Sequence, residues 1–269
     1  MTEDEMVQGA RGGDRRALSA LVGYTKDKVY NLAARMLGDP VLAEDATQEI
    51  LIRVITGLAT YRAESSLSTW VYRVAANQLL TLRKSRSETM SDSLEGMEGE
   101  IAEGLVANDA PLEDQVLITE AKLACTSRMI LGLDRDHRLA FILGEILELS
   151  AEEGASVLEV SPEAFRKRLS RARERMGRFL QGSCGVENPE RPCRCARQGA
   201  RFQRLGFMEQ RVWTCLPTTR EADPVRVKEL DAVGATLGVL RSHPSYAAPE
   251  RLGHLVRDLI QKGTSDLWQ

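Results

Sequence analysis

The sequence predicts an all-α protein built from two small helical domains. Three observations predict this: apolar residues recur at helical spacing in several segments, alternating runs typical of strands are scarce, and aromatic residues make up only 5% of the chain. The chain has 269 residues, 43% of them hydrophobic and 28% charged, which is enough for two or three soluble domains. No apolar run approaches the roughly 20 residues of a membrane span, and the acidic N-terminus is unlike a signal peptide. We therefore expect a cytoplasmic protein without a membrane span.

The first helical domain is predicted within residues 10–86. Residues 14–37 carry apolar side chains at helical spacing, and the Gly-Asp-Pro sequence that follows ends this helix. A second helix is expected over residues 43–58 and a third from about residue 68. Three polar side chains of the second helix share a face that is separate from its apolar stripe: Asp45, Gln48 and Glu49.

The loop at residues 60–70 joins the second and third helices and is rich in hydroxyl groups. Two aromatic residues and an arginine flank these hydroxyls, a combination suited to a single-stranded nucleic acid, since rings stack on bases and arginine binds phosphate. The alternative is structural: Tyr61 and Trp70 would anchor the core, and Ser68 and Thr69 would cap the third helix.

An acidic stretch separates the first domain from the second. Residues 87–121 contain ten Asp or Glu and no Lys or Arg. We interpret residues 87–112 as a flexible acidic linker, which would be either a solvated tether or a segment that imitates nucleic-acid charge in a basic channel.

The second helical domain is predicted over residues 113–181. Ser150 and Glu153 form a capping box, and Ser161 with Pro162 begins a last helix. That helix carries seven basic and two acidic residues between positions 162 and 180. Two helices joined by a tight turn, the second one basic, indicate a helix-turn-helix that reads duplex DNA, although a solvated basic helix would have the same spacing.

These residues resemble two regions of a known family. The stretches 36–49 and 60–77 resemble region 2 of bacterial RNA polymerase sigma factors of the extracytoplasmic-function (ECF) class, in the sigma-70 family, and residues 169–176 resemble the end of region 4. The resemblance implies a non-enzymatic factor that binds core RNA polymerase, recognises promoters, melts the −10 element and starts transcription.

The resemblance also implies roles for particular residues. The face of Asp45, Gln48 and Glu49 would bind the clamp helices of the largest polymerase subunit, with a second contact at the polymerase flap, and the linker would enter the active-site and RNA-exit channels. The residues implied at the −10 element are Tyr61, Arg62, Ser65, Ser66, Ser68, Thr69, Trp70, Tyr72, Arg73 and Asn77. Those implied at the −35 element are Ser161, Glu163, Arg166, Lys167, Arg168, Ser170, Arg171 and Arg173. A separate anti-sigma factor is compatible with the same pattern.

Residues 183–269 extend beyond the usual end of this family, and we expect them to form a separate, Cys-containing module. Cys184, Cys193, Cys195 and Cys215 have the thiol content of a Zn²⁺ or Cu⁺ site, with His243 or His254 as other fourth ligands. Redox-reversible thiols and inert structural cysteines are the alternatives, and Cys125 is expected to be a buried small hydrophobic residue.

Our hypothesis for this extension is a built-in regulator, which clamps or releases the two DNA readers as metal or redox state changes. The alternative is a passive structural module. For the whole chain, the other hypothesis is a metal- or thiol-responsive DNA-binding regulator that does not bind polymerase. An enzyme is disfavoured, because the sequence has no glycine-rich phosphate loop and only three widely spaced histidines.

Overall fold

A computed structural model describes residues 1–83, 93–102, 110–206 and 245–253. These residues are helical or irregular and include no strand, which confirms the predicted all-α class. The backbones of Cys184 and Cys193 form one isolated β-bridge, which is not a disulfide. Within the described part of the chain, no helix is long and apolar enough to cross a membrane.

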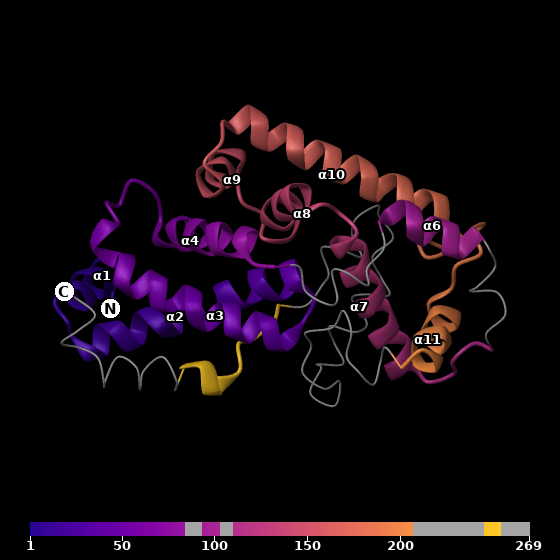
Figure 1. The fold of residues 1–269 in the computed structure, drawn as a ribbon, viewed down its shortest axis with the longest axis horizontal. Helices are drawn as coiled ribbons and strands as arrows, with labels where there is room; N and C mark the ends of the chain where they lie inside the picture. The colour runs from indigo at the N-terminus through magenta and orange to yellow at the C-terminus, as the bar shows by residue number, and fades with distance from the viewer. Residues whose placement is uncertain (84–92, 103–109, 207–244, 254–269) are drawn as a thin grey trace.

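The first domain contains α1 (Glu3–Arg11), α2 (Arg15–Leu37), α3 (Pro40–Gly57), the 3₁₀ turn η1 (Leu58–Thr60) and α4 (Leu67–Thr81). The central helix α2 packs against α1, α3 and α4 (Figure 1). It ends at Gly38, which adopts the left-handed conformation with φ of 62°, and Asp39 then caps α3 through the backbone N–H groups of Val41 and Leu42.

The second domain contains α7 (Gln115–Leu131), α8 (Arg135–Phe141), the π-helical turn η2 (Ile142–Ile146), α9 (Ala151–Leu158) and α10 (Pro162–Ser183). The predicted capping box of Ser150 and Glu153 is present, and Ser161 caps α10 as expected. The fully buried ring of Phe165 lies against Gly154, where a Cβ atom would come within 2.2 Å of it. This close approach joins α9 to α10.

The acidic linker differs from the prediction. Its described residues include α6 (Leu94–Ala102), a helix packed along α10. Leu94 and Met97 are 2% and 3% exposed in the main core, and Glu95 pairs with Arg175 of α10. The apolar residues recur at helical spacing between the acids, so one face can be buried while the carboxylates face outward or pair with arginines. The other parts of the predicted linker lie mainly outside the described residues.

The described parts of the C-terminal extension pack on the two helical domains, in contrast to the separate module that we predicted. Helix α11 (Cys195–Arg204) packs against α7, and its Phe202 is fully buried. Residues 245–253, drawn in yellow in Figure 1, contact α2 and α3. In the described part of the extension, apolar side chains such as Phe202 and Leu252 leave water by covering the domains that precede them.

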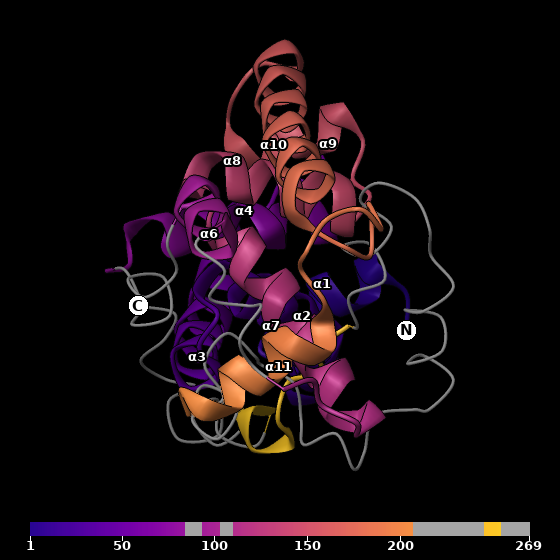
Figure 2. The same ribbon diagram turned by 90° about the vertical axis from the view of Figure 1, so that its right-hand side faces the viewer.

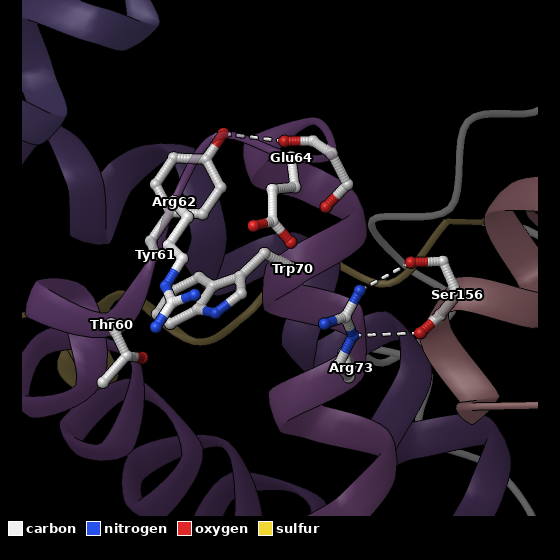
Figure 3. A pocket seen from close by; sticks show the side chains of 8 residues that line it. Thr60, Tyr61, Arg62, Glu64, Trp70, Arg73 and Ser156 are labelled. Carbon is white, nitrogen blue, oxygen red and sulfur yellow. Dashed lines mark hydrogen bonds between the residues drawn. The ribbon is translucent and has the colours of Figure 1, made fainter.

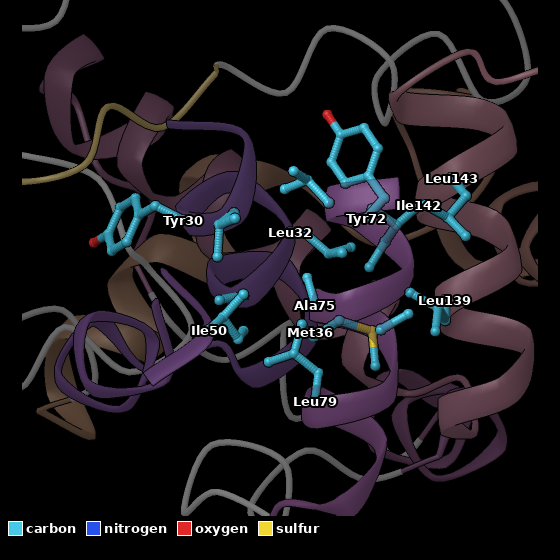
Figure 4. Packing of buried hydrophobic residues seen from close by; sticks show 14 of the residues in the cluster. Tyr30, Leu32, Met36, Ile50, Tyr72, Ala75, Leu79, Leu139, Ile142 and Leu143 are labelled. Carbon is cyan, nitrogen blue, oxygen red and sulfur yellow. The ribbon is translucent and has the colours of Figure 1, made fainter. Parts of the chain in front are cut away.

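A single core cluster crosses the boundary between the two helical domains. Met36, Tyr72 and Leu79 of the first domain and Leu139 and Ile142 of the second belong to one set of buried residues (Figure 4). As a result, α8, α9 and α10 lie over α4 in Figure 1, and the view in Figure 2 shows the same layering.

Candidate functional site

The predicted polar face of α3 is formed and open. Asp45 and Glu49 are exposed and Gln48 is half-buried, whereas Ala43, Ala46 and Ile50 on the opposite side are at most 3% exposed. Glu49 accepts a hydrogen bond from Arg53 at 2.9 Å, one turn further along. The structure therefore brings Asp45, Gln48 and Glu49 together on the outside of the molecule.

The loop before α4 surrounds a cavity of about 460 Å³ (Figure 3). The rings of Tyr61 and Trp70 lie 5.5 Å apart at 50°, and the Tyr61 hydroxyl donates to the Ser65 carbonyl at 2.9 Å. The lining residues are Thr60, Tyr61, Arg62, Glu64, Ser65, Trp70, Arg73 and Ser156. A pocket with aromatic, hydroxyl and guanidinium groups has the chemistry to hold a single base.

Several of the predicted −10 contacts have structural roles instead. Ser66, rather than Ser68 or Thr69, caps α4 by accepting from the Thr69 backbone N–H at 3.1 Å, and Thr69 is only 2% exposed. The Ser68 hydroxyl hydrogen-bonds with the Tyr24 hydroxyl at 2.8 Å. Trp70 is 9% exposed, as the structural alternative predicts.

Tyr72 is also in the core, at 7% exposure, and burial raises its pKa to about 12. A neutral, buried phenol does not reach DNA in this conformation. The amphipathic spacing of α4 could have indicated this, because Tyr72 lies one turn from the buried residues Ala75 and Ala76.

The outward polar groups of α4 face helix α9 of the second domain. Arg73 donates to the Ser156 backbone carbonyl at 2.9 Å and to the Ser156 hydroxyl at 2.5 Å. Asn77 donates to a carboxylate oxygen of Glu159 at 3.4 Å. Ser156 and Glu159 were not among the predicted site residues, because a contact across more than 80 residues has no local sequence signal.

The first half of α10 presents its basic side chains to solvent. Arg166, Lys167 and Arg171 are exposed and Arg168 is half-buried, while Phe165 and Leu169 point inward as predicted. The hydroxyl of Ser170 and the carboxylate of Glu163 are exposed on the same helix. Ser161 uses its side chain to accept from the Ala164 backbone N–H at 3.1 Å.

Arg173 differs from the other basic residues of α10. Its guanidinium pairs with Glu145 of η2, a carboxylate with only 1% residue exposure. Leaving a buried carboxylate without this cation would be costly, so the pair has a structural function. Arg173 therefore positions α10 on η2 rather than extending freely toward DNA.

Four described cysteines gather where α7, the end of α10 and the start of α11 meet. The backbones of Cys184 and Cys193 are paired in the isolated β-bridge, and the Gly185 N–H donates to the Cys193 carbonyl at 3.1 Å. Cys125, Cys184 and Cys193 line one small cavity. Burial and the neighbouring thiols raise the pKa of Cys193 to about 12. Cys125 lies among apolar residues, as expected, but it is half-buried rather than buried and it also faces this cluster.

The described residues do not complete a metal site. They contain no group of three or more His, Cys, Asp or Glu side chains arranged to hold an ion, and their cysteines are not in disulfides. Cys215, His243 and His254, the remaining predicted ligands, lie outside the described residues.

Comparisons with known proteins agree with this arrangement. The family model of Sigma-70 region 2 matches residues 21–89 and that of Sigma-70 region 4 matches residues 123–176. The chain is 29% identical over 177 residues to the ECF RNA polymerase sigma factor SigW of Bacillus subtilis, covering 65% of this chain and 95% of the relative. It is 30% identical over 181 residues to the RNA polymerase sigma-H factor of Pseudomonas aeruginosa, covering 66% and 94%. With the ECF RNA polymerase sigma-E factor of Escherichia coli K12 it shares 29% identity over 186 residues, covering 67% and 95%.

The two helical domains and these matches define a transcription initiation factor and not an enzyme. More specifically, the chain belongs to the ECF sigma factors of the sigma-70 family. It binds core RNA polymerase and promoter DNA, as sigma factors do. Neither family model reaches the extension that begins at residue 183.

Proposed function

We propose that α3 is the main contact with core polymerase, through Asp45, Gln48 and Glu49 on the clamp helices of the largest subunit. The observation that carries this proposal is the open polar face of α3, opposite a fully packed apolar face. Exposed carboxylates can pair with basic side chains of a partner at little cost in desolvation.

Charge reversal tests this assignment. Asp45→Arg should reduce the affinity for core polymerase at least about tenfold, because a favourable charge contact becomes a repulsive one. Glu190→Arg makes a comparable charge change at an exposed position between Cys184 and Cys193, and this variant should bind as the parent does. Equal binding by both variants would place the polymerase contact elsewhere.

For the −10 element, we propose that the cavity between Tyr61, Ser65 and Arg73 receives an unpaired base. Arg62 and Asn77 would contact the neighbouring backbone, since they are exposed at the cavity and along α4, whereas Ser66 keeps its capping role. Thr69, Trp70 and Tyr72 would support the pocket from the core. Tyr61→Ala should weaken binding of a single-stranded −10 oligonucleotide by about 1–3 kcal/mol of stacking free energy, measured by fluorescence anisotropy.

For the −35 element, we propose that α10 enters the major groove with Arg166, Lys167 and Arg171 leading. Their exposure at the start of a helix that follows a tight turn supports this docking. Arg168, Ser170 and Glu163 would contact the edges of the groove, and Arg173 would hold the helix in place.

Binding at the −10 element requires the two domains to separate in this proposal. Ser156 forms one wall of the cavity, and both Arg73 and Asn77 already donate hydrogen bonds to α9. The polymerase would hold the two readers apart at promoter spacing, so that two modest affinities multiply.

We further propose that the extension regulates this factor through its thiols. Cys184, Cys193 and Cys195 would contribute ligands to Zn²⁺ or Cu⁺, and Cys215 or His243 would complete the set. The closeness of these thiols supports this, since Cys184 and Cys193 line one small cavity and a cation would relieve the mutual repulsion that the neighbouring thiols would experience when ionised. A reversible disulfide is the redox form of the same proposal.

Metal content and transcription of the full chain test the extension. The parent should contain stoichiometric metal by elemental analysis, and Cys193→Ser should lose it, whereas Val186→Ala in the same exposed loop should keep it. Run-off transcription with core polymerase, with and without a chelator or a mild oxidant, reports the regulation. A passive module would give equal transcription under all these conditions.

A further inference from the structure

Residues 245–253 lie far along the chain from α2 and yet bind it through specific main-chain contacts. The Asn31 side chain donates to the Tyr246 carbonyl at 2.5 Å and accepts from the Tyr246 N–H at 2.6 Å. One turn earlier, Asp27 accepts from the Ala248 N–H at 2.9 Å. The Asn31 carboxamide thus replaces a strand partner for the segment, and a shift of the segment by one residue would break all three bonds.

The same segment buries apolar surface on the first domain. Tyr246, Ala248 and Leu252 are 3%, 5% and 2% exposed and belong to the main core cluster. The Tyr246 ring lies over the guanidinium of Arg35, with 4.7 Å between the guanidinium carbon and the ring centroid. Burial of these groups stabilises the docked segment through the hydrophobic effect and a cation–π contact.

The docked segment reaches the helix that carries the proposed polymerase face. Arg251 donates to a carboxylate oxygen of Glu44 at 2.8 Å, in an ion pair at the solvent-exposed rim. Glu44 directly precedes Asp45 and lies one helical turn before Gln48 on the same side of α3. The segment therefore borders this face and removes one acidic charge next to it.

We propose that residues 245–253 are an intramolecular ligand of region 2 that competes with core RNA polymerase for the surface formed by α2 and α3. This inference rests on the proposed role of Asp45, Gln48 and Glu49. While the segment is docked, its backbone is bound to Asn31 and Asp27 of α2, and Arg251 occupies the border of the polymerase face on α3. Polymerase binding then requires the segment to leave.

The rim contact of the segment suits a displaceable ligand. The pair of Arg251 and Glu44 lies at the solvent-exposed rim, where an ion pair typically contributes only about 0–1 kcal/mol. Because the segment belongs to the same chain, its binding to α2 and α3 is intramolecular and does not depend on the concentration of the protein. Binding of this kind can be nearly complete in the free factor and still yield to a large partner.

Two variants of the full chain release the segment by different means. Tyr246→Ala removes the buried ring, and Arg251→Glu replaces the rim ion pair with repulsion while leaving the core intact. If the segment is docked in about 90% of molecules, each release should raise the affinity for core polymerase by up to about tenfold. Glu250→Gln, an exposed residue in the same segment, is the matched control and should leave affinity unchanged.

The two measurements are polymerase affinity and amide exchange at Ala248. Faster exchange together with tighter polymerase binding supports the competition. Faster exchange with unchanged or weaker binding overturns it, because the segment would then be a structural brace only. Unchanged exchange in both variants also overturns it, since the contacts described above would not be holding the segment.

A third variant separates this inference from the polymerase assignment. Asp45→Arg should reduce polymerase binding in both the parent and the Arg251→Glu background. If Asp45→Arg has no effect, the assignment of the α3 face fails. If Asp45→Arg weakens binding but neither release variant strengthens it, the α3 assignment holds and the competition alone is rejected.

Discussion

Helices α4 and α10 both read promoter DNA in the proposed function, but the structure leaves them in different states. The basic first half of α10 is open to solvent at Lys167 and Arg171, and Arg166 forms only an exposed ion pair with Glu152 at 3.5 Å. The outward groups of α4 are held by α9, through Arg73 on Ser156 and Asn77 on Glu159. The difference indicates an order of events in which the −35 reader is available in the free factor and the −10 reader becomes available after the domains separate.

The largest expected effect comes from removing the helix-turn-helix support. Phe165→Ala deletes a fully buried ring packed on Gly154 and should destabilise the second domain by about 3–5 kcal/mol. The variant should affect both DNA-reading helices, because α10 loses its packing on α9 and α9 no longer covers α4. Urea unfolding measures the loss. A destabilisation below about 1 kcal/mol would contradict the packing described here.

The carboxylate of Glu100, where α6 meets α7 and α11, gives a pH-dependent test with an effect of intermediate size. Burial alone would raise the pKa of Glu100 on α6, but hydrogen bonds from Arg128 and Arg201, at 2.8 and 2.7 Å, hold it at about 2 instead of 4.5. The folded-state pKa is depressed, so this stabilisation is present above pH 4.5 and is lost as the pH falls toward 2.

Glu100→Gln should therefore lower the free energy of unfolding at pH 7 by roughly 1–2 kcal/mol, after allowance for solvent screening. The difference from the parent should shrink steadily below pH 4.5, as followed by urea unfolding at several pH values. Glu98→Gln, an exposed carboxylate on the same helix, is the control and should change stability little at any pH. A pH-independent loss for Glu100→Gln would show that its charge is not the cause.

A smaller effect is expected from weakening the contact between α4 and α9, which tests directly whether α9 keeps α4 from binding DNA. Ser156→Ala removes one of the two hydrogen bonds from Arg73 to α9, a loss of about 0.5–1.5 kcal/mol. The domains should open more often, and binding of a single-stranded −10 oligonucleotide should tighten by a few fold. Ser170→Ala removes an exposed hydroxyl from α10 and serves as the control. Weaker −10 binding by Ser156→Ala would argue that Ser156 contacts DNA instead.

The smallest effect concerns the open reader. Lys167→Ala should reduce the salt dependence of −35 duplex binding by about one unit of slope, because one phosphate contact is lost. Arg178→Ala removes the same charge further along α10, beyond the proposed groove contact, and should leave the slope unchanged. Identical slopes for Lys167→Ala and the parent would place Lys167 away from the DNA backbone.

Helix boundaries and the buried face of α10 could be predicted from the sequence because their causes are local. Ser161 and Pro162 begin a helix by capping and by a fixed φ, and Phe165 and Leu169 lie one turn apart. Helix α6 was missed because its acidic composition outweighed the spacing of Leu94, Met97 and Ile101, which was the available signal.

The remaining site features depend on contacts between distant segments. Nothing near Arg73 indicates Ser156, and nothing near Asn31 indicates Tyr246, so the covered state of α4 and the docked segment needed a structure. Thr69 and Tyr72 resemble nucleic-acid contacts by residue type, but their positions on the buried side of α4 decide otherwise. Residue chemistry predicted the class of ligand better than it predicted which side chains reach it.

Arg138 gives the boundary between the domains a further property. Its guanidinium donates to the Met36 carbonyl of α2 at 2.6 Å and to the carbonyls of Leu131 and Leu133 at 2.7 and 2.9 Å, while remaining 4% exposed. A guanidinium stays charged at any physiological pH, so acidity cannot unlock it gradually. A partial separation of the domains would break hydrogen bonds of the buried Arg138 guanidinium without letting water reach either the guanidinium or the carbonyl groups it had bound. Opening of this boundary should therefore be a two-state change, in which the domains are either docked through Arg138 or fully separated there, with little population of partly opened forms.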